Sequence, residues 1–81
     1  MARKMSRSMG EAMSKRIAKL YGVSVEDGPK FNDVWNGPDR PMVGWEGGPY
    51  EWVYSDEVAA LAPKGWYVEP VNHWAIALYP I

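Results

Sequence analysis

The stretch "VGWEGGPYEWVYSDEVAALAPKGWYVEPVNHWAIALYP", residues 43–80, contains four of the five tryptophans in this chain of 81 residues. Residues 50–54, "YEWVY", are rich in aromatic and β-branched side chains, which predicts a strand. Residues 66–69 and 74–79 show the same bias and flank "PVNH", in which Pro and Asn favour a tight turn. The stretch therefore predicts one strand followed, after a short helix, by a C-terminal β-hairpin.

The pairing within this hairpin decides which side chains share a face. If Glu69 lies opposite Trp74, large side chains face small ones and both faces of the hairpin are apolar. One face then holds Trp66, Val68, Ala75 and Ala77, and the other holds Tyr67, Trp74, Ile76 and Leu78. A single short helix covers only one face, so the second needs the central loop, a partner subunit or a ligand. We expect Trp66 and Trp74 to belong to the core.

Two helices are predicted. The first runs from about Met9 to Tyr21, because Ser8 and Glu11 have the spacing of a capping box and Gly22 occupies the position of a left-handed C-cap. Its apolar residues recur at three- and four-residue steps and form one stripe. The stripe consists of Met9, Met13, Ile17 and either Leu20 or Tyr21. The second helix is short and covers residues 55–61, with a serine as its N-cap.

The middle of the chain, residues 24–49, places Gly next to Pro three times and predicts a turn-rich loop. The sequence therefore predicts an α+β fold. A basic N-terminal helix packs on a small antiparallel sheet of three strands, which includes the C-terminal hairpin, and the long loop connects them. We expect residues 1–7 to form a mobile basic arm and residues 8–81 to form a single small globular domain.

The composition excludes several kinds of site. The chain has no cysteine and a single histidine, His73, which excludes disulfides and thiolate or histidine-rich metal sites. We therefore expect no metal and no cofactor. The chain has no run of 18 apolar residues, so no membrane span is expected. The lack of cysteine fits a cytoplasmic protein.

Residues suited to catalysis are scarce. His73 lies beside a predicted turn and has no nucleophile and orienting group arranged around it in the sequence. Glu46 and Glu51 flank "GGPY" among aromatic residues, a pattern that suits a carboxylate pair over a stacked sugar, although carboxylates beside glycine-rich loops are usually only solvated. A chain of this length has little room for a substrate pocket beside its own core. We therefore expect a protein that is not an enzyme.

The charge is divided between the two parts of the chain. Residues 1–20 carry a net charge of +5 and residues 21–81 a net charge of −6. The basic part suits an acidic partner, which is nucleic acid, a membrane surface, another protein or the acidic part of the same chain. Nucleic-acid binding is thus one alternative function. Its expected phosphate contacts are Arg3, Lys4, Arg7, Lys15, Arg16 and Lys19.

Residues 17–27, "IAKLYGVSVED", resemble the helix-turn-helix family in the small residue of the first helix, the glycine of the turn and the start of the recognition helix. The matching residues are Ala18, Gly22, Val23 and Ser24. The resemblance implies a recognition helix after the turn. Gly28 and Pro29 would end that helix after little more than one turn, which would leave the bases of a DNA groove out of reach.

In size, lack of cysteine, tryptophan content and charge division, the chain resembles the small accessory proteins of bacteriophages. This resemblance implies docking on a host macromolecule. We expect a small interaction protein that modulates or inhibits a protein partner, or that forms a homo-oligomer. Trp and Tyr are strong interface anchors, and the predicted contacts are Trp35, Trp45, Tyr50 and Trp52, with Arg40 at the rim. A structural virion component is a further alternative, and it predicts ordered assembly.

Overall fold

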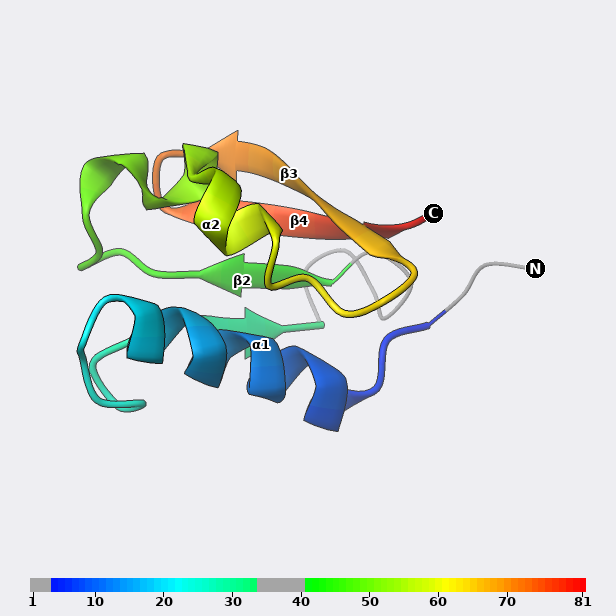
Figure 1. The fold of residues 1–81 in the computed structure, drawn as a ribbon, viewed down its shortest axis with the longest axis horizontal. Helices are drawn as coiled ribbons and strands as arrows, with labels where there is room; N and C mark the ends of the chain where they lie inside the picture. The colour runs from blue at the N-terminus through cyan, green and yellow to red at the C-terminus, as the bar shows by residue number, and fades with distance from the viewer. Residues whose placement is uncertain (1–3, 34–40) are drawn as a thin grey trace.

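The computed structural model describes residues 4–33 and 41–81, and the four strands that it contains form one antiparallel sheet in the order β1-β2-β4-β3. In chain order the elements are α1 (Arg7–Leu20), β1 (Lys30–Asn32), β2 (Met42–Gly44), the 3-10 helix η1 (Tyr50–Tyr54), α2 (Asp56–Ala59), β3 (Trp66–Asn72) and β4 (Ala75–Pro80). Figure 1 shows α1 along the β1 side of the sheet and α2 in front of β4. The predicted α+β fold, with a long helix packed on a small antiparallel sheet, is confirmed.

Helix α1 begins two residues earlier than the sequence pattern indicates. Its N-cap is Ser6, whose Oγ accepts a hydrogen bond from the backbone N–H of Met9 at 3.2 Å, so the predicted cap at Ser8 is wrong. Either Ser6 or Ser8 can accept a capping hydrogen bond, and the burial of the residue before Ser6 selects Ser6. Met5 is only 3% exposed and joins the core, which fixes the chain just before Ser6. Of the expected basic arm, residues 1–3 lie outside the described residues.

The C-terminal end of α1 is the predicted one. Gly22 has a φ of 70°, in the left-handed region that glycine adopts without a steric penalty. Its N–H donates to the Lys19 carbonyl at 3.1 Å, and the Val23 N–H donates to the Ala18 carbonyl at 3.0 Å. These two bonds form a Schellman motif and satisfy carbonyls that would otherwise be unpaired. The turn that follows leads directly into β1, so the described chain has no recognition helix here.

The hairpin of β3 and β4 is confirmed, but its register differs from the prediction. Glu69 lies opposite Ala77 rather than Trp74, and the pairing is irregular between Pro70 and Asn72. The strand therefore continues through most of "PVNH", and the turn comes later. The Asn72 side chain closes it, since its Oδ1 accepts from the Trp74 N–H at 2.9 Å.

The corrected register puts the large aliphatic residues of the hairpin on one face. Ile76 and Leu78 share the helix-covered face with Trp66 and Val68, in a core that also contains α1, η1 and α2 side chains. The second face holds the alanines of β4 and the ring of Tyr67. The core thus uses one face of the sheet, and Trp66 belongs to it as predicted.

Three elements differ from the expected ones because long-range contacts decide them. Residues 50–54 form η1 rather than a strand. Trp52 and Val53 are adjacent and both buried in the same core, which a strand with alternating sides does not allow. Strands β1 and β2 lie within the region predicted as loop. Each has three residues, too few to give a periodic signal, and β2 is held by strands on both sides.

Candidate functional site

The predicted contact residues separate into three groups. Trp35 and Arg40 lie outside the described residues. Tyr50 is 69% exposed, whereas Trp45 and Trp52 are 7% and 0% exposed. The expectation that these two tryptophans are presented at the surface is therefore wrong.

Trp45 and Trp52 are buried because each completes the packing of the other. Their ring centroids lie 5.8 Å apart in an edge-on arrangement, and Tyr21, the C-cap residue of α1, packs on Trp45 at 5.4 Å. The Trp45 Nε1 donates to the Asp27 carbonyl at 2.9 Å, which satisfies its polar atom inside the fold. The Trp52 Nε1 has no hydrogen-bond partner among the described residues. Through its contacts with Tyr21 and Asp27, the Trp45 ring anchors the segment that connects α1 to β1.

The basic residues of α1 lie at the surface. Arg7 forms ion pairs with Asp33 at 3.2 Å and with Glu11 at 3.8 Å. The other described basic residues of this segment make no ion pair within the part of the chain that the structure describes. They are Lys4, Lys15, Arg16 and Lys19, and all are exposed. Arg3 lies outside the described residues. The acidic part of the chain therefore neutralises Arg7 alone among the residues described.

The second face of the sheet, opposite the helices, carries a separate group of aromatic residues. Trp74 and Tyr79 pack over Met42, Ala75 and Ala77, whose side chains are nearly fully buried beneath them. Tyr67 lies opposite Tyr79 in the hairpin, at a ring distance of 5.6 Å, and is 47% exposed. Glu69 lies on the same face. We call the residues Tyr67, Glu69, Trp74 and Tyr79 the aromatic face.

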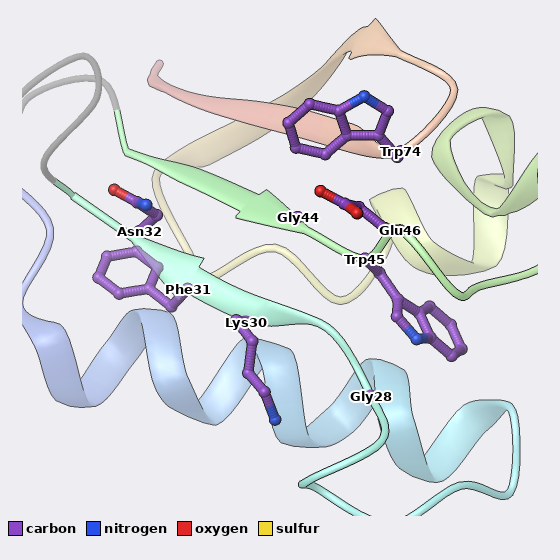
Figure 2. A pocket seen from close by; sticks show the side chains of 8 residues that line it. All are labelled: Gly28, Lys30, Phe31, Asn32, Gly44, Trp45, Glu46 and Trp74. Carbon is purple, nitrogen blue, oxygen red and sulfur yellow. The ribbon is translucent and has the colours of Figure 1, made fainter.

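An open hollow of about 330 Å³ adjoins the aromatic face where β1, β2 and the turn before β4 meet. The residues that line it include Lys30, Phe31, Asn32, Gly44, Glu46 and Trp74. Figure 2 shows the Trp74 indole above β2 at Gly44, with the Glu46 carboxylate on the same side and the Trp45 ring turned away from both. A Cβ at Gly44 would lie 3.4 Å from Cζ3 of Trp74. This is an ordinary contact distance, so the indole packs against β2 at this position.

The two charged side chains that line this hollow, Lys30 and Glu46, differ in their hydrogen bonds. Lys30 directs its Nζ away from Trp74, and this atom donates to the Val25 carbonyl at 2.6 Å and the Glu26 carbonyl at 2.9 Å. Glu46 is exposed and has no hydrogen bond or ion pair within the described part of the chain. The hollow thus combines one flat indole with one carboxylate that is open to a ligand. Glu51, the second carboxylate of the sugar-binding pattern, does not line it.

A second exposed aromatic pair lies near the hairpin turn. The rings of Tyr50 and His73 are stacked with centroids 5.7 Å apart and planes 13° from parallel. His73 is exposed, as expected for a residue beside a turn. Sequence reasoning identified Tyr50 but assigned Trp74 to the core. The signal near Trp74 was Asn72, two residues earlier, whose Oδ1 accepts from the Trp74 N–H and closes the turn before β4.

In the described ranges, no set of three or more His, Asp or Glu side chains is grouped so that it could hold a metal ion. The helices described there are all too short or too polar to cross a membrane. Comparison of the chain with protein-family models, curated proteins and solved structures finds no significant match.

Proposed function

We propose that this protein is a small, non-catalytic binding domain that docks on a protein partner through its aromatic face. One observation carries the proposal. The sheet already has a complete core on its other face, yet Tyr67 remains 47% exposed beside Tyr79 and Trp74. Large exposed rings are typical anchors of interfaces, because Tyr and Trp bury much area with few rotatable bonds. The absence of cysteine supports a cytoplasmic setting for this binding.

The proposal is tested with a photo-crosslinking amino acid placed at position 67. In cells that make the protein, we expect this variant to give one recurrent crosslinked protein. Tyr54 supplies the matched control, because it is a tyrosine with 59% exposure that lies on η1, away from the aromatic face. The proposal predicts no such crosslink from position 54. Crosslinks that are absent from both positions, or equal from both, would contradict it.

The interaction is then measured with the purified partner. Replacing a ring that anchors an interface costs about 2 kcal/mol or more, which corresponds to a loss of affinity of about 30-fold. We expect this loss for Tyr67→Ser and no loss for Tyr54→Ser. If the recurrent crosslinked protein is a second copy of this chain, light scattering will show a discrete oligomer. Open-ended assembly would instead favour a structural component.

A second candidate function is nucleic-acid binding through α1. Its support is the set of exposed lysines and arginines that make no ion pair in the described part of the chain. The test is binding to a DNA duplex over a range of salt concentrations. Lys15→Glu combined with Arg16→Glu should abolish the binding, and their neutral replacement by Gln should lower the slope of log affinity against log salt by about 2. A wild-type protein that does not bind at low salt would exclude this function.

A further inference from the structure

We propose that a second hollow, between α1 and the turn that precedes β3, binds a phosphate group of a nucleic-acid backbone. The inference rests on the second candidate function, nucleic-acid binding through α1, and it adds a cation from outside that helix. The hollow has a volume of about 330 Å³. We call it the basic hollow, and its lining consists of Ser8, Met9, Ala12, Arg16, Pro63 and Lys64.

The turn that carries Lys64 is fixed by its own backbone bond. The Trp66 N–H donates to the Pro63 carbonyl at 3.0 Å, and Gly65 has a φ of 90°, as the third residue of a type II turn does. Trp66 is 4% exposed and begins β3 inside the core. The backbone of Lys64 is therefore held in place, and Figure 1 shows this turn beside the N-terminal half of α1.

The two charged side chains of the basic hollow are both cations. Arg16 reaches it from α1 and Lys64 from the turn, and both residues are exposed. Neither makes a hydrogen bond or an ion pair within the described part of the chain. The described lining contains no Asp or Glu. Two like charges at one hollow repel each other, and an anion bound between them offsets this repulsion.

Lys64 belongs to the part of the chain that is otherwise acidic. Residues 21–81 carry three basic side chains, Lys30, Arg40 and Lys64, against nine acidic ones. Lys30 is engaged, since its Nζ donates to two backbone carbonyls, and Arg40 lies outside the described residues. Lys64 is thus the one described cation of this part that makes no such bond. Its position opposite Arg16 joins it to the basic surface of α1.

The Ser8 hydroxyl adds an uncharged donor to the basic hollow. The Ser6 Oγ accepts from the Met9 N–H, so its own proton is available for the Ser8 Oγ, which lies 3.3 Å away. The Ser8 proton can then be donated to a ligand oxygen. A phosphate group has several acceptor oxygens and suits a set of two charged donors and one hydroxyl. The lining therefore has the donors that a phosphate site requires.

The surroundings favour a backbone phosphate over a free nucleotide. The described lining has no aromatic ring on which a base could stack. Lys15 and Lys19 continue the exposed charge along α1 from Arg16 and are likewise without an ion pair in the described residues. A nucleic-acid strand presents a row of phosphates, so one phosphate can occupy the basic hollow while its neighbours meet these lysines.

The experiment measures the affinity of the purified protein for a short DNA duplex between about 50 and 200 mM salt. Lys64→Gln removes one phosphate contact and should lower the slope of log affinity against log salt by about 1. Lys30→Gln is the matched control, because it removes a lysine charge from residues 21–81 but not from the basic hollow. It should leave the slope unchanged, and circular dichroism checks that both variants are folded. An unchanged slope in Lys64→Gln, or an equal drop in both variants, would overturn the inference.

An NMR titration of the isotope-labelled protein locates the bound phosphate. We expect the duplex to shift the backbone amides of Ser8, Arg16 and Lys64. Inorganic phosphate should give much smaller shifts at the same phosphate concentration, because a single ion lacks the further contacts along α1. Equal shifts with the ion and the duplex would indicate an adventitious ion only and would contradict the proposal. A larger response to a phosphoserine peptide than to the duplex would assign the hollow to a phosphorylated protein instead.

The outcomes also separate this inference from the functions proposed above. If replacing Lys15 and Arg16 by Gln lowers the slope but Lys64→Gln does not, nucleic-acid binding through α1 stands and the inference fails. If the wild-type protein does not bind the duplex at low salt, the second candidate function and this inference fail together. Neither result affects the crosslink expected from position 67, because Tyr67 lies on the face of the sheet opposite the helices.

Discussion

Two adjacent glycines, Gly47 and Gly48, show how one side chain sets the sequence around it. A Cβ at Gly48 would lie 2.5 Å from ring atoms of Trp45, whereas a Cβ at Gly47 would meet nothing within 4 Å. The Trp45 ring has no room to move, because it is 7% exposed and its Nε1 is bound to the Asp27 carbonyl. Neither glycine has a positive φ. The difference between the two positions is therefore one of space alone.

We predict that Gly48→Ala lowers the free energy of unfolding by about 1–3 kcal/mol, the range for overpacking a filled core. Gly47→Ala is the matched control and should leave that free energy unchanged or raise it by up to about 1 kcal/mol, through the unfolded chain. Urea denaturation followed by circular dichroism measures both. Equal midpoints for the two variants would show that the Trp45 ring moves aside.

The sequence indicated that the aromatic residues form most of the core, but it did not predict correctly which rings point into the core. Trp66 was assigned correctly to the core. Trp45, predicted as a surface contact, lies in the helix-covered core, and Trp74, predicted as a core residue, lies on the second face. The bond that fixes Trp45 joins it to Asp27, and no pattern near either residue indicates this contact. A side chain in a loop follows the local backbone angles, which long-range packing sets. Candidate residues chosen from a loop are therefore less certain than those chosen from a helix.

At the scale of elements, local chemistry determines the C-terminal end of α1 and the start of α2. α1 closes with two backbone bonds at Gly22, and α2 begins with Ser55, whose Oγ accepts from the Val58 N–H at 3.3 Å. Both were predicted from sequence because capping depends on a few consecutive residues. The strands β1 and β2 were not predicted, since each exists through pairing with residues far along the chain.

The start of α1 gives a direct test of this view. Ser6→Ala removes the side-chain acceptor for the Met9 N–H and should lower the free energy of unfolding by about 1 kcal/mol. Ser8→Ala, two residues later, places a better helix former inside the helix and should raise it by up to about 0.7 kcal/mol. Thermal and urea unfolding of the two variants will distinguish them. If Ser8→Ala were destabilising and Ser6→Ala were not, the N-cap in solution would be Ser8.

At the scale of the whole molecule, the aromatic residues divide between two faces of one sheet. Trp45, Trp52 and Trp66 lie in the helix-covered core, whereas Trp74 lies on the second face. The hairpin pattern in the sequence predicted a surplus of apolar surface, and the corrected register locates it on the second face. The division of charge was also visible in the sequence, but not that Arg7 alone of the described α1 cations is paired.

This division predicts the fluorescence of the protein. In a Trp35→Phe background, three of the four remaining tryptophans are buried and should resist quenching by acrylamide. The accessible part of the emission should come from Trp74 and disappear when Trp74→Phe is added. A large accessible fraction in the double variant would show that the helix-covered core opens in solution. Steady-state quenching curves of the two variants provide the comparison.

Strand β4 has a consequence for how the chain is made. It pairs with β2 on one side and β3 on the other, yet it is the last of the described elements in the chain. On a ribosome, β1 and β2 therefore emerge with no strand to join them to β3, and the sheet is completed only when β4 has been synthesised. We expect nascent chains stalled before Ala75 to remain sensitive to protease, and those that extend past Ile81 by a linker to become resistant in a single step.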